Sequence, residues 1–419
     1  MTEPKRETLG IKTFTTADGG QTAVQERTRQ AAVTSNIQRP REEPTTFSPA
    51  YPGLPDSLPA RTALLCVTAE GSHFKLHWFL NGESDESRPE EIAVQSAPKA
   101  TMSEILRTKE WKRAYKELRA WWCDFMRLIG WMDGLLGDQD QHGPLRLVVW
   151  DNTGFQIPWE AVYLDPSDRW VGAEVEVIRW TSIKDIGRVA SYTAVPATCT
   201  GGVLALESAD IFDPDGRPLL DEPLARYGAT AKRRMWQLLT ALDSTRSRFG
   251  LVLVRCHGIY GDSMSDFELA EMTMVDVEEF RMSALATFPA LVFLNACDTA
   301  SPARPGPHSF VATRTFAELF LRRGANSVLA TLGQVDLDHS HDFAARLLAA
   351  EDVQQRLAAL LREHRSKAVD RVRPRADDEE ADSRNDQDFE RFFQSFAYVY
   401  FGHPDTVLHL TATSNEPSA

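Results

Sequence analysis

Residues 251–258 read LVLVRCHG and residues 291–300 read LVFLNACDTA, and these two stretches decide the fold. Each begins with four consecutive apolar residues, which are typical of a strand covered on both faces of a parallel sheet. Each then reaches a side chain with acid–base or nucleophilic chemistry, His257 in the first and Cys297 in the second. We therefore expect two buried strands that each deliver one reactive group just beyond the carboxyl end.

Further apolar runs indicate that these two strands belong to a larger sheet. Three of them lie at 145–150, 202–206 and 327–331. Helical patterns separate the runs at about 228–245, 276–286, 312–323 and 339–363. Parallel strands need such helical crossovers, and a last apolar run at 396–401 is expected to complete the sheet. The sequence thus predicts an α/β fold, with a mainly parallel sheet and helices on both of its faces.

The composition of successive segments also predicts how the chain is divided into a tail and folded parts. Residues 1–60 are polar and lack apolar periodicity, so we expect a disordered tail. Residues 61–140 predict a β-hairpin and one long helix, which pack on the domain that follows. The α/β domain is expected over 141–412, interrupted at 369–389 by a flexible acidic insertion.

The long helix of the N-terminal segment is expected to begin at Thr101, because Thr101 and Glu104 have the spacing of a capping box. Aromatic residues follow at helical spacing, among them Trp111, Tyr115 and Trp122. Such a stripe is more typical of a core face than of a ligand site.

Composition excludes several classes of function. The formal net charge is −14, with 46 basic and 60 acidic residues, so a nucleic-acid partner is not expected. No stretch approaches the roughly 20 apolar residues of a membrane span, and the N-terminus lacks the apolar core of a secretion signal. The 5 cysteines are odd in number and far apart, which fits reduced thiols. We therefore expect a cytoplasmic protein without a membrane partner.

The two reactive residues are expected to meet at one edge of the sheet. A right-handed crossover between their strands makes the strands parallel, and open α/β sheets place their active crevice at the carboxyl edge. A thiol at Cys297 with an imidazole at His257 suffices for acyl transfer. The amides of Gly258 and Cys297 could form an oxyanion hole, in which one donor contributes about 3 to 4 kcal/mol. Taken singly, the cysteine is typical of an inert core residue and the His-Gly pair of a turn.

Beyond these residues, the chain resembles the CHAT-domain peptidases, bacterial relatives of caspases and separases. The resemblance lies, in family order, in VVWDNTGFQIPWE at 148–160, CHG at 256–258, LNACDT at 294–299, FLRRGANSVLATL at 320–332 and YVYFGHP at 398–404. It implies a caspase-like fold and a cysteine endopeptidase without cofactor or metal. It also implies that Cys297 is the nucleophile, that His257 protonates the leaving amine, and that no third catalytic side chain is needed.

The resemblance further implies protein substrates, an activating partner protein and a role as a triggered effector in bacterial signalling or antiphage defence. Two departures from the family pattern are expected to alter the substrate groove. Gly333 and Gln334 stand where the family often has a tryptophan, and the acidic insertion near 377 lengthens a surface loop. Relatives use an acidic pocket residue to take a basic side chain, in some of them two positions before the nucleophile. That position is Asn295 here.

Asp336 and Asp338 are alternative pocket residues, although for Asp338 we favour capping of the helix that follows. Two other functions remain open. One is a catalytically silent protein-interaction module of the same family. The other is a metal-dependent hydrolase built on the carboxylates and imidazoles between Asp336 and Asp342, but their spacing matches no ligand pattern.

Overall fold

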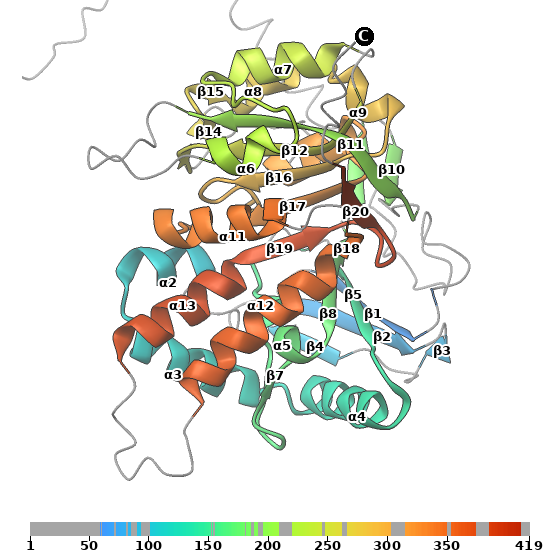
Figure 1. The fold of residues 1–419 in the computed structure, drawn as a ribbon. Coiled ribbons are helices and arrows are strands. Elements are labelled where there is room, and N and C mark those ends of the chain that lie inside the picture. Colours follow the sequence, from blue (N-terminus) through green and yellow to red (C-terminus); the bar gives the residue numbers. More distant parts are fainter. Residues whose placement is uncertain are drawn as a thin grey trace, which may run out of the picture. The chain divides into compact units, whose positions relative to one another are not determined.

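One large sheet of 13 strands organises the described part of the chain (Figure 1). The computed structural model describes residues 59–411 apart from 60, 71–72, 81–82, 85–89, 94–100, 152, 154–155, 181, 186–187, 192–195, 209–219, 245–247, 262–265, 303–314, 350–352 and 374–384. The tail predicted over 1–60 lies outside the described residues, apart from Pro59.

The sheet consists of two parallel blocks of opposite direction. The first block contains, in spatial order, β20 (Val407–Leu410), β11 (Thr198–Glu207), β12 (Phe249–Arg255), β16 (Leu291–Asn295) and β17 (Ser327–Thr331). The second contains β19 (Tyr398–Phe401), β8 (Glu176–Trp180), β5 (Arg146–Asp151) and β1 (Thr62–Glu70). The antiparallel pair of β17 and β19 joins the blocks. The α/β prediction with a mainly parallel sheet is therefore confirmed.

Short antiparallel strands close the two edges of the sheet. They are β18 (Gln355–Arg356) beside β20, and β2 (His73–Leu80), β3 (Glu83–Ser84) and β4 (Glu90–Ala93) beyond β1. Three smaller sheets are β6 (Tyr163–Leu164) with β7 (Arg169–Trp170), β9 (Ser182–Asp185) with β10 (Arg188–Ser191), and β13 (Gly258–Ile259) with β14 (Glu268–Leu269) and β15 (Met272–Thr273).

Helices cover both faces of the central strands, because every residue of β16 and β17 is buried. The crossover and covering helices are α5 (Val171–Glu174), α6 (Asp221–Ala225), α7 (Met235–Asp243), α8 (Met274–Glu278), α9 (Ser283–Thr287), α10 (Phe316–Arg322), α11 (Leu337–Ala349), α12 (Leu357–Val372) and α13 (Asp386–Ala397), with a short 3₁₀ helix η2 (Trp159–Ala161). Among the helices that the structure describes, none has both the length and the apolar character that crossing a bilayer requires.

The N-terminal segment differs from its prediction in one respect. The expected hairpin is β1 with β2, and β1 also pairs with β5, so the hairpin extends the main sheet. The single long helix, however, is wrong. The structure has three helices instead, α2 (Met102–Thr108), α3 (Trp111–Cys123) and α4 (Met126–His142). The first break lies at Lys109, whose left-handed conformation (φ 58°) ends α2. Thr101 caps α2 by accepting from the Glu104 amide at 3.2 Å.

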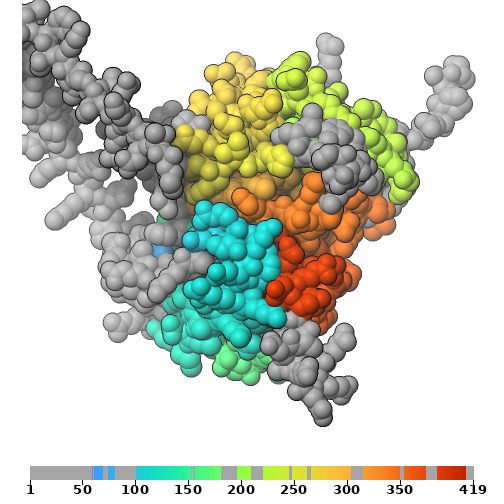
Figure 2. All heavy atoms as spheres, turned by 90° about the vertical axis from the view of Figure 1, so that its left-hand side faces the viewer, coloured from blue at the N-terminus to red at the C-terminus, as the bar shows by residue number. Residues whose placement is uncertain are grey.

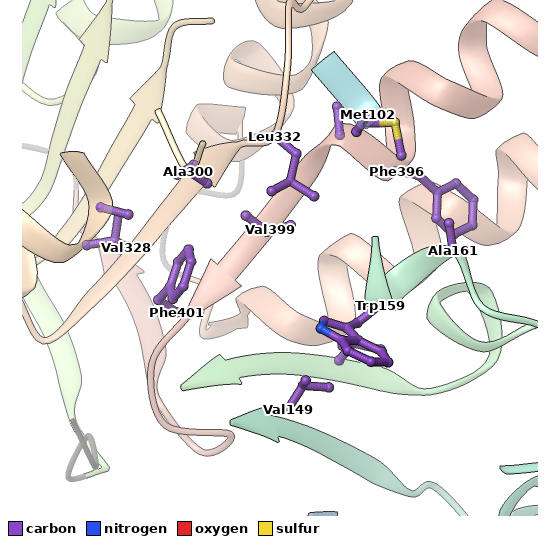
Figure 3. Packing of buried hydrophobic residues seen from close by; sticks show 14 of the residues in the cluster. Met102, Val149, Trp159, Ala161, Ala300, Val328, Leu332, Phe396, Val399 and Phe401 are labelled. Atoms are coloured by element: carbon purple, nitrogen blue, oxygen red, sulfur yellow. The ribbon is translucent and has the colours of Figure 1, made fainter. Parts of the chain in front are cut away.

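The aromatic stripe of α3 forms core contacts with α13. The rings of Trp111 and Phe393 stack with centroids 6.0 Å apart, and Tyr115 meets Phe389 edge-on at 5.1 Å. Figure 2 shows the surface of this N-terminal region, in cyan, adjoining that of α13, in red. Figure 3 shows the same core farther along, where Met102 of α2 and Phe396 of α13 belong to one cluster of buried side chains.

The helix expected at 339–363 is two helices, α11 and α12, separated by β18. The acidic insertion expected at 369–389 is also shorter than predicted. Val369 and Val372 are buried in the last turns of α12, and Phe389 is buried in the first turns of α13. These apolar side chains anchor both ends of the expected insertion in the core. Residues 374–384 lie outside the described residues.

Candidate active site

Two neighbouring strands bring His257 and Cys297 to the same edge of the sheet. β12 and β16 are parallel, and Arg255 at the end of the first lies opposite Asn295 at the end of the second. His257 and Cys297 each follow two positions later, so both emerge at the carboxyl edge. Both line one pocket of about 390 Å³. The His257 side chain is exposed and Cys297 is half-buried, so a ligand in the pocket has access to both.

The backbone of Gly258 lies directly against that of Cys297. A Cβ atom added to Gly258 would lie 2.3 Å from the Cys297 carbonyl oxygen and 3.3 Å from its nitrogen, so only glycine fits here. Strand β13 holds this turn by pairing with β14, and the Ala270 amide donates to the His257 carbonyl at 3.2 Å. The imidazole-bearing turn is therefore fixed beside the cysteine.

The Cys297 thiol is surrounded by backbone amides. Burial raises its pKa and is the largest effect, while hydrogen bonding from the amides of Val335, Gly258 and Cys297 itself acts in the opposite direction. The carboxylate of Asp298 raises this pKa further. The thiol is consequently protonated at neutral pH in the free protein, and its activation requires a base that takes the proton.

The residues after Cys297 form a tight connection with the segment that follows β17. Asp298 is in the left-handed region (φ 58°), which aspartate tolerates better than most residues, and its amide donates to the Gly333 carbonyl at 3.1 Å. The Ser301 hydroxyl donates to the Asp298 carboxylate at 3.0 Å. Burial raises the pKa of Asp298, and hydrogen bonds from Ser103 and Ser301 counteract the rise. These contacts hold Asp298, the neighbour of Cys297, on both sides.

Asn295 lines the pocket, but its side-chain amide is engaged within the protein. The side-chain nitrogen donates to the Ser340 carbonyl at 2.9 Å, and its oxygen accepts from the Tyr398 hydroxyl at 3.0 Å. Only 3% of Asn295 is exposed. Through these two hydrogen bonds, Asn295 connects β16 to α11 and to β19.

The two aspartates before and within α11 have different places. Asp336 lines the pocket and caps α11, because its Oδ1 accepts from the amides of Asp338 at 2.9 Å and His339 at 3.3 Å. Asp338 lies in the first turn of α11, outside the pocket lining. The capping role that we favoured for Asp338 is thus wrong. Asp336 stands one residue before the helix and has the geometry of an N-cap.

Several pocket residues were missed by sequence reasoning. Glu390 and Gln394 come from α13, Leu106 comes from α2, and Lys109 directly follows α2. Nothing in the sequence places these distant segments beside Cys297. Arg255 is also in the lining, and it pairs at 2.7 Å with the fully buried Glu207 of β11. A lone cation at the end of an apolar strand was the signal that could have identified Arg255.

His339, near Asp336, is partly buried on α11 and lies against the buried His364. His339 Nε2 lies 3.1 Å from His364 Nε2, and burial lowers the pKa of His339 to about 4. Within the described residues, no three side chains of His, Cys, Asp or Glu gather as a set of metal ligands. The geometry therefore favours a buried hydrogen-bonded pair of neutral imidazoles at this place.

Comparison with known proteins follows from this architecture. The chain matches the family model of the CHAT domain over residues 127–398. It is also similar to separase of Saccharomyces cerevisiae, solved in complex with securin, with 8% identity and a TM-score of 0.39 over 84% of this chain and 30% of that chain. No curated protein sequence matches. Because the family model covers more than half of the chain, the chain belongs to the CHAT-domain family.

Proposed function

We propose that the protein is a cysteine endopeptidase in which His257 and Cys297 form the catalytic dyad. His257 takes the thiol proton, and the sulfur attacks the scissile carbonyl carbon, forming a C–S bond. The tetrahedral intermediate then collapses, the C–N bond breaks, and the imidazolium gives its proton to the leaving amine. Water, deprotonated by the same imidazole, hydrolyses the thioester and restores the thiol. These steps of acylation and hydrolysis need no cofactor and no metal.

The contact between Gly258 and Cys297 carries this proposal. It places two backbone amides beside the sulfur, where an attacked carbonyl would develop its negative charge. Preformed amide donors need no reorganisation during the reaction, which makes them effective stabilisers of an oxyanion. The amide of Val335 also faces the sulfur and is available to position the substrate backbone.

We further propose that the pocket accepts a basic side chain before the cut. Asp336, just before α11, and Glu390, on α13, supply two carboxylates to the lining. Arg255 is neutralised by Glu207, and Lys109 is the other basic side chain of the lining. Of the three residues predicted to bind the substrate, Asp336 is therefore the one that we assign to recognition. The Asn295 side chain supports the pocket wall through its hydrogen bonds to Ser340 and Tyr398. We propose no role in substrate recognition for Asp338, which lies outside the pocket lining.

Protein substrates, an activating partner protein and a role as a triggered bacterial signalling or defence effector are the biological part of this proposal. They come from the family resemblance. No disulfide joins any of the five cysteines, which is consistent with a reducing cytoplasm. The charge balance remains a reason to look for proteins rather than nucleic acids as direct partners.

The experiment compares the parent protein with Cys297→Ala, His257→Ala and the control Cys123→Ser, using a proteome-derived peptide library and mass spectrometry. Cys123 is another half-buried thiol, on α3 and outside the pocket. We expect new peptide termini with the parent and the control, and none with the two dyad variants. Equal cleavage by the parent and Cys297→Ala would exclude Cys297 as the nucleophile.

A catalytically silent interaction module is the second candidate. The observation in its favour is that the pKa of Cys297 is raised rather than lowered, whereas reactive thiols usually have a lowered pKa. Alkylation with iodoacetamide at pH 7 separates the two candidates. A peptidase should lose its Cys297 thiol faster than Cys123, and the His257→Ala variant should abolish that preference; a silent module should show no such preference in either protein.

A further inference from the structure

Helix α2 precedes the residues that the family model matches, yet it reaches the candidate active site. The match begins at residue 127, and α2 spans Met102–Thr108. Leu106 and the following Lys109 line the same pocket as Cys297. The pocket is therefore completed by a helix from outside the matched region.

Helix α2 lies directly against Gly333, in the segment that follows β17. A Cβ atom added to Gly333 would lie 2.7 Å from Leu106 Cδ1, 2.8 Å from Ser103 Cα and 3.0 Å from the Ser103 nitrogen. The helix backbone thus rests on the glycine itself. The Gly333 carbonyl in turn accepts from the amide of Asp298, the residue next to Cys297, at 3.1 Å. This is a short path from α2 to the nucleophile.

A second path runs through polar side chains. The Ser103 hydroxyl hydrogen-bonds the carboxylate of Asp298, and the guanidinium of Arg107 lies close enough to favour its charged form. The Ser103 amide also donates to Gln156 Oε1 at 3.4 Å. The amide nitrogen of Gln156 then contacts the Ser301 hydroxyl and the Leu332 carbonyl. Both sides of the Cys297 connection are therefore linked to one turn of α2.

Helix α2 is also anchored in the core. Met102, Ile105 and Leu106 are buried, and α2 packs on α13. Helix α13 supplies Gln394, whose Oε1 accepts from the amide of Asp336 at 2.9 Å. Figure 3 shows Met102 and Leu332 among the buried residues of this cluster. The helix is thus clamped between the core and the segment that carries the pocket wall.

We propose that α2 is a positioning element of the active site, which holds the 332–336 segment and Asp298 in the arrangement that aligns Cys297 with the pocket. Leu106 acts through Gly333, and Ser103 acts through Asp298. The inference rests on the proposed function for its catalytic readout alone. The chemical reactivity of the Cys297 thiol reports on the same coupling whether or not the protein cleaves peptides.

The test compares Leu106→Ala with Ile105→Ala in the full chain. Both residues are buried in α2, but only Leu106 touches Gly333 and lines the pocket. We expect similar losses of thermal stability in the two variants. Leu106→Ala alone should lower kcat on a cleaved library peptide about tenfold, because a small displacement of catalytic groups is costly. It alone should also speed the alkylation of Cys297 by iodoacetamide, by about fivefold, because the thiol becomes more accessible.

Ser103→Ala is the second variant, for the case that Leu106→Ala does not fold. Alanine is favourable in a helix, and the substitution removes only the hydroxyl group. It should lower kcat with little change in KM and leave the melting temperature within a few degrees of the parent. The proposal is overturned if Cys297 alkylation and kcat respond alike to Leu106→Ala and Ile105→Ala, or if Ser103→Ala leaves both rates unchanged. If the parent cleaves no peptide, the peptidase proposal fails. The alkylation rates of Cys297 in the parent and the variants still test whether α2 positions the residues around Cys297.

Discussion

Gly258 and Cys297 are separated by a whole crossover in sequence, yet their backbones are in direct contact, with no room for a Cβ atom between them. This contact exists because β12 and β16 are adjacent parallel strands in register, so the chain turns away from both strands at the same level. It makes one glycine responsible for two properties of the site, the approach of the His257 turn and the direction of an amide toward the sulfur.

The first prediction concerns that glycine. In Gly258→Ala, the new methyl group meets the Cys297 carbonyl at 2.3 Å and forces the turn away. We expect kcat/KM to fall at least about 100-fold, as is typical when one oxyanion donor is lost. The matched control is Gly134→Ala on the exposed side of α4, where an added Cβ meets nothing within 4 Å. That variant should keep full activity and gain about 0.5 to 1 kcal/mol of stability.

A second prediction separates the two roles of Asp336. Asparagine can still cap α11 but carries no charge, so Asp336→Asn should leave stability unchanged and lower kcat/KM at least about tenfold for peptides with arginine or lysine before the cut. Asp336→Ala should cost about 1 kcal/mol of stability in addition. Urea unfolding and cleavage of matched peptide pairs measure the two effects. Unchanged preference for basic peptides in Asp336→Asn would remove Asp336 from substrate recognition.

A third prediction concerns the buried ion pair of Glu160 and Arg179. Arg179 donates from Nε to Oε1 at 2.8 Å and from Nη2 to Oε2 at 2.5 Å, and the two side chains are almost completely buried. Removing one charge leaves the other unpaired in the core, so Glu160→Gln should cost about 3 to 5 kcal/mol. The exposed pair of Arg113 and Glu117 is the control. Glu117→Gln should cost about 0.5 kcal/mol or less, and equal losses in both variants would contradict the prediction.

The fourth prediction concerns acid stability and the pair of His339 and His364. Burial lowers the pKa of His339 to about 4 and that of His364 well below its usual value, and nearby Arg346 acts in the same direction on both. Between pH 6.5 and 4 the unfolded chain binds protons that the folded chain excludes, so stability must fall as the pH is lowered through this window. For His339 alone the loss is on the order of 3 kcal/mol.

The measurement for this pair is the free energy of urea unfolding at pH 7, 5.5 and 4.5. His339→Gln should give a visibly flatter dependence on pH than the parent, because the glutamine does not titrate and can still hydrogen-bond His364. Parallel curves for the two proteins would show that His339 is not protonated on unfolding.

The sequence predicted the strands of the site well because their signal is local. Four consecutive apolar residues at 251–254 and at 291–294 can be buried only where helices cover both faces of a sheet, and all eight are fully buried. The same pattern placed His257 and Cys297 just beyond the strand ends. Their pairing as neighbours needed only the rule that connects parallel strands by right-handed crossovers.

The helices were predicted less accurately because their ends depend on tertiary packing. One lysine at 109 in a left-handed conformation divides the expected long helix into α2 and α3, although lysine has no intrinsic preference for that conformation. Packing of both helices against α13 decides the break. In the same way, the N-cap of α11 is Asp336 rather than Asp338, because the cap depends on where the chain leaves β17 and not on residue type.

By itself, then, the sequence determined the fold class, the buried strands and the position of His257 and Cys297 just beyond their ends, since hydrophobic periodicity is written within short segments. Only the tertiary structure decided the rest: the contact of Gly258 with Cys297, the engagement of Asn295 by Tyr398, and the pocket walls from α2 and α13. Those features join residues that are far apart along the chain, and such contacts form only when the whole core packs.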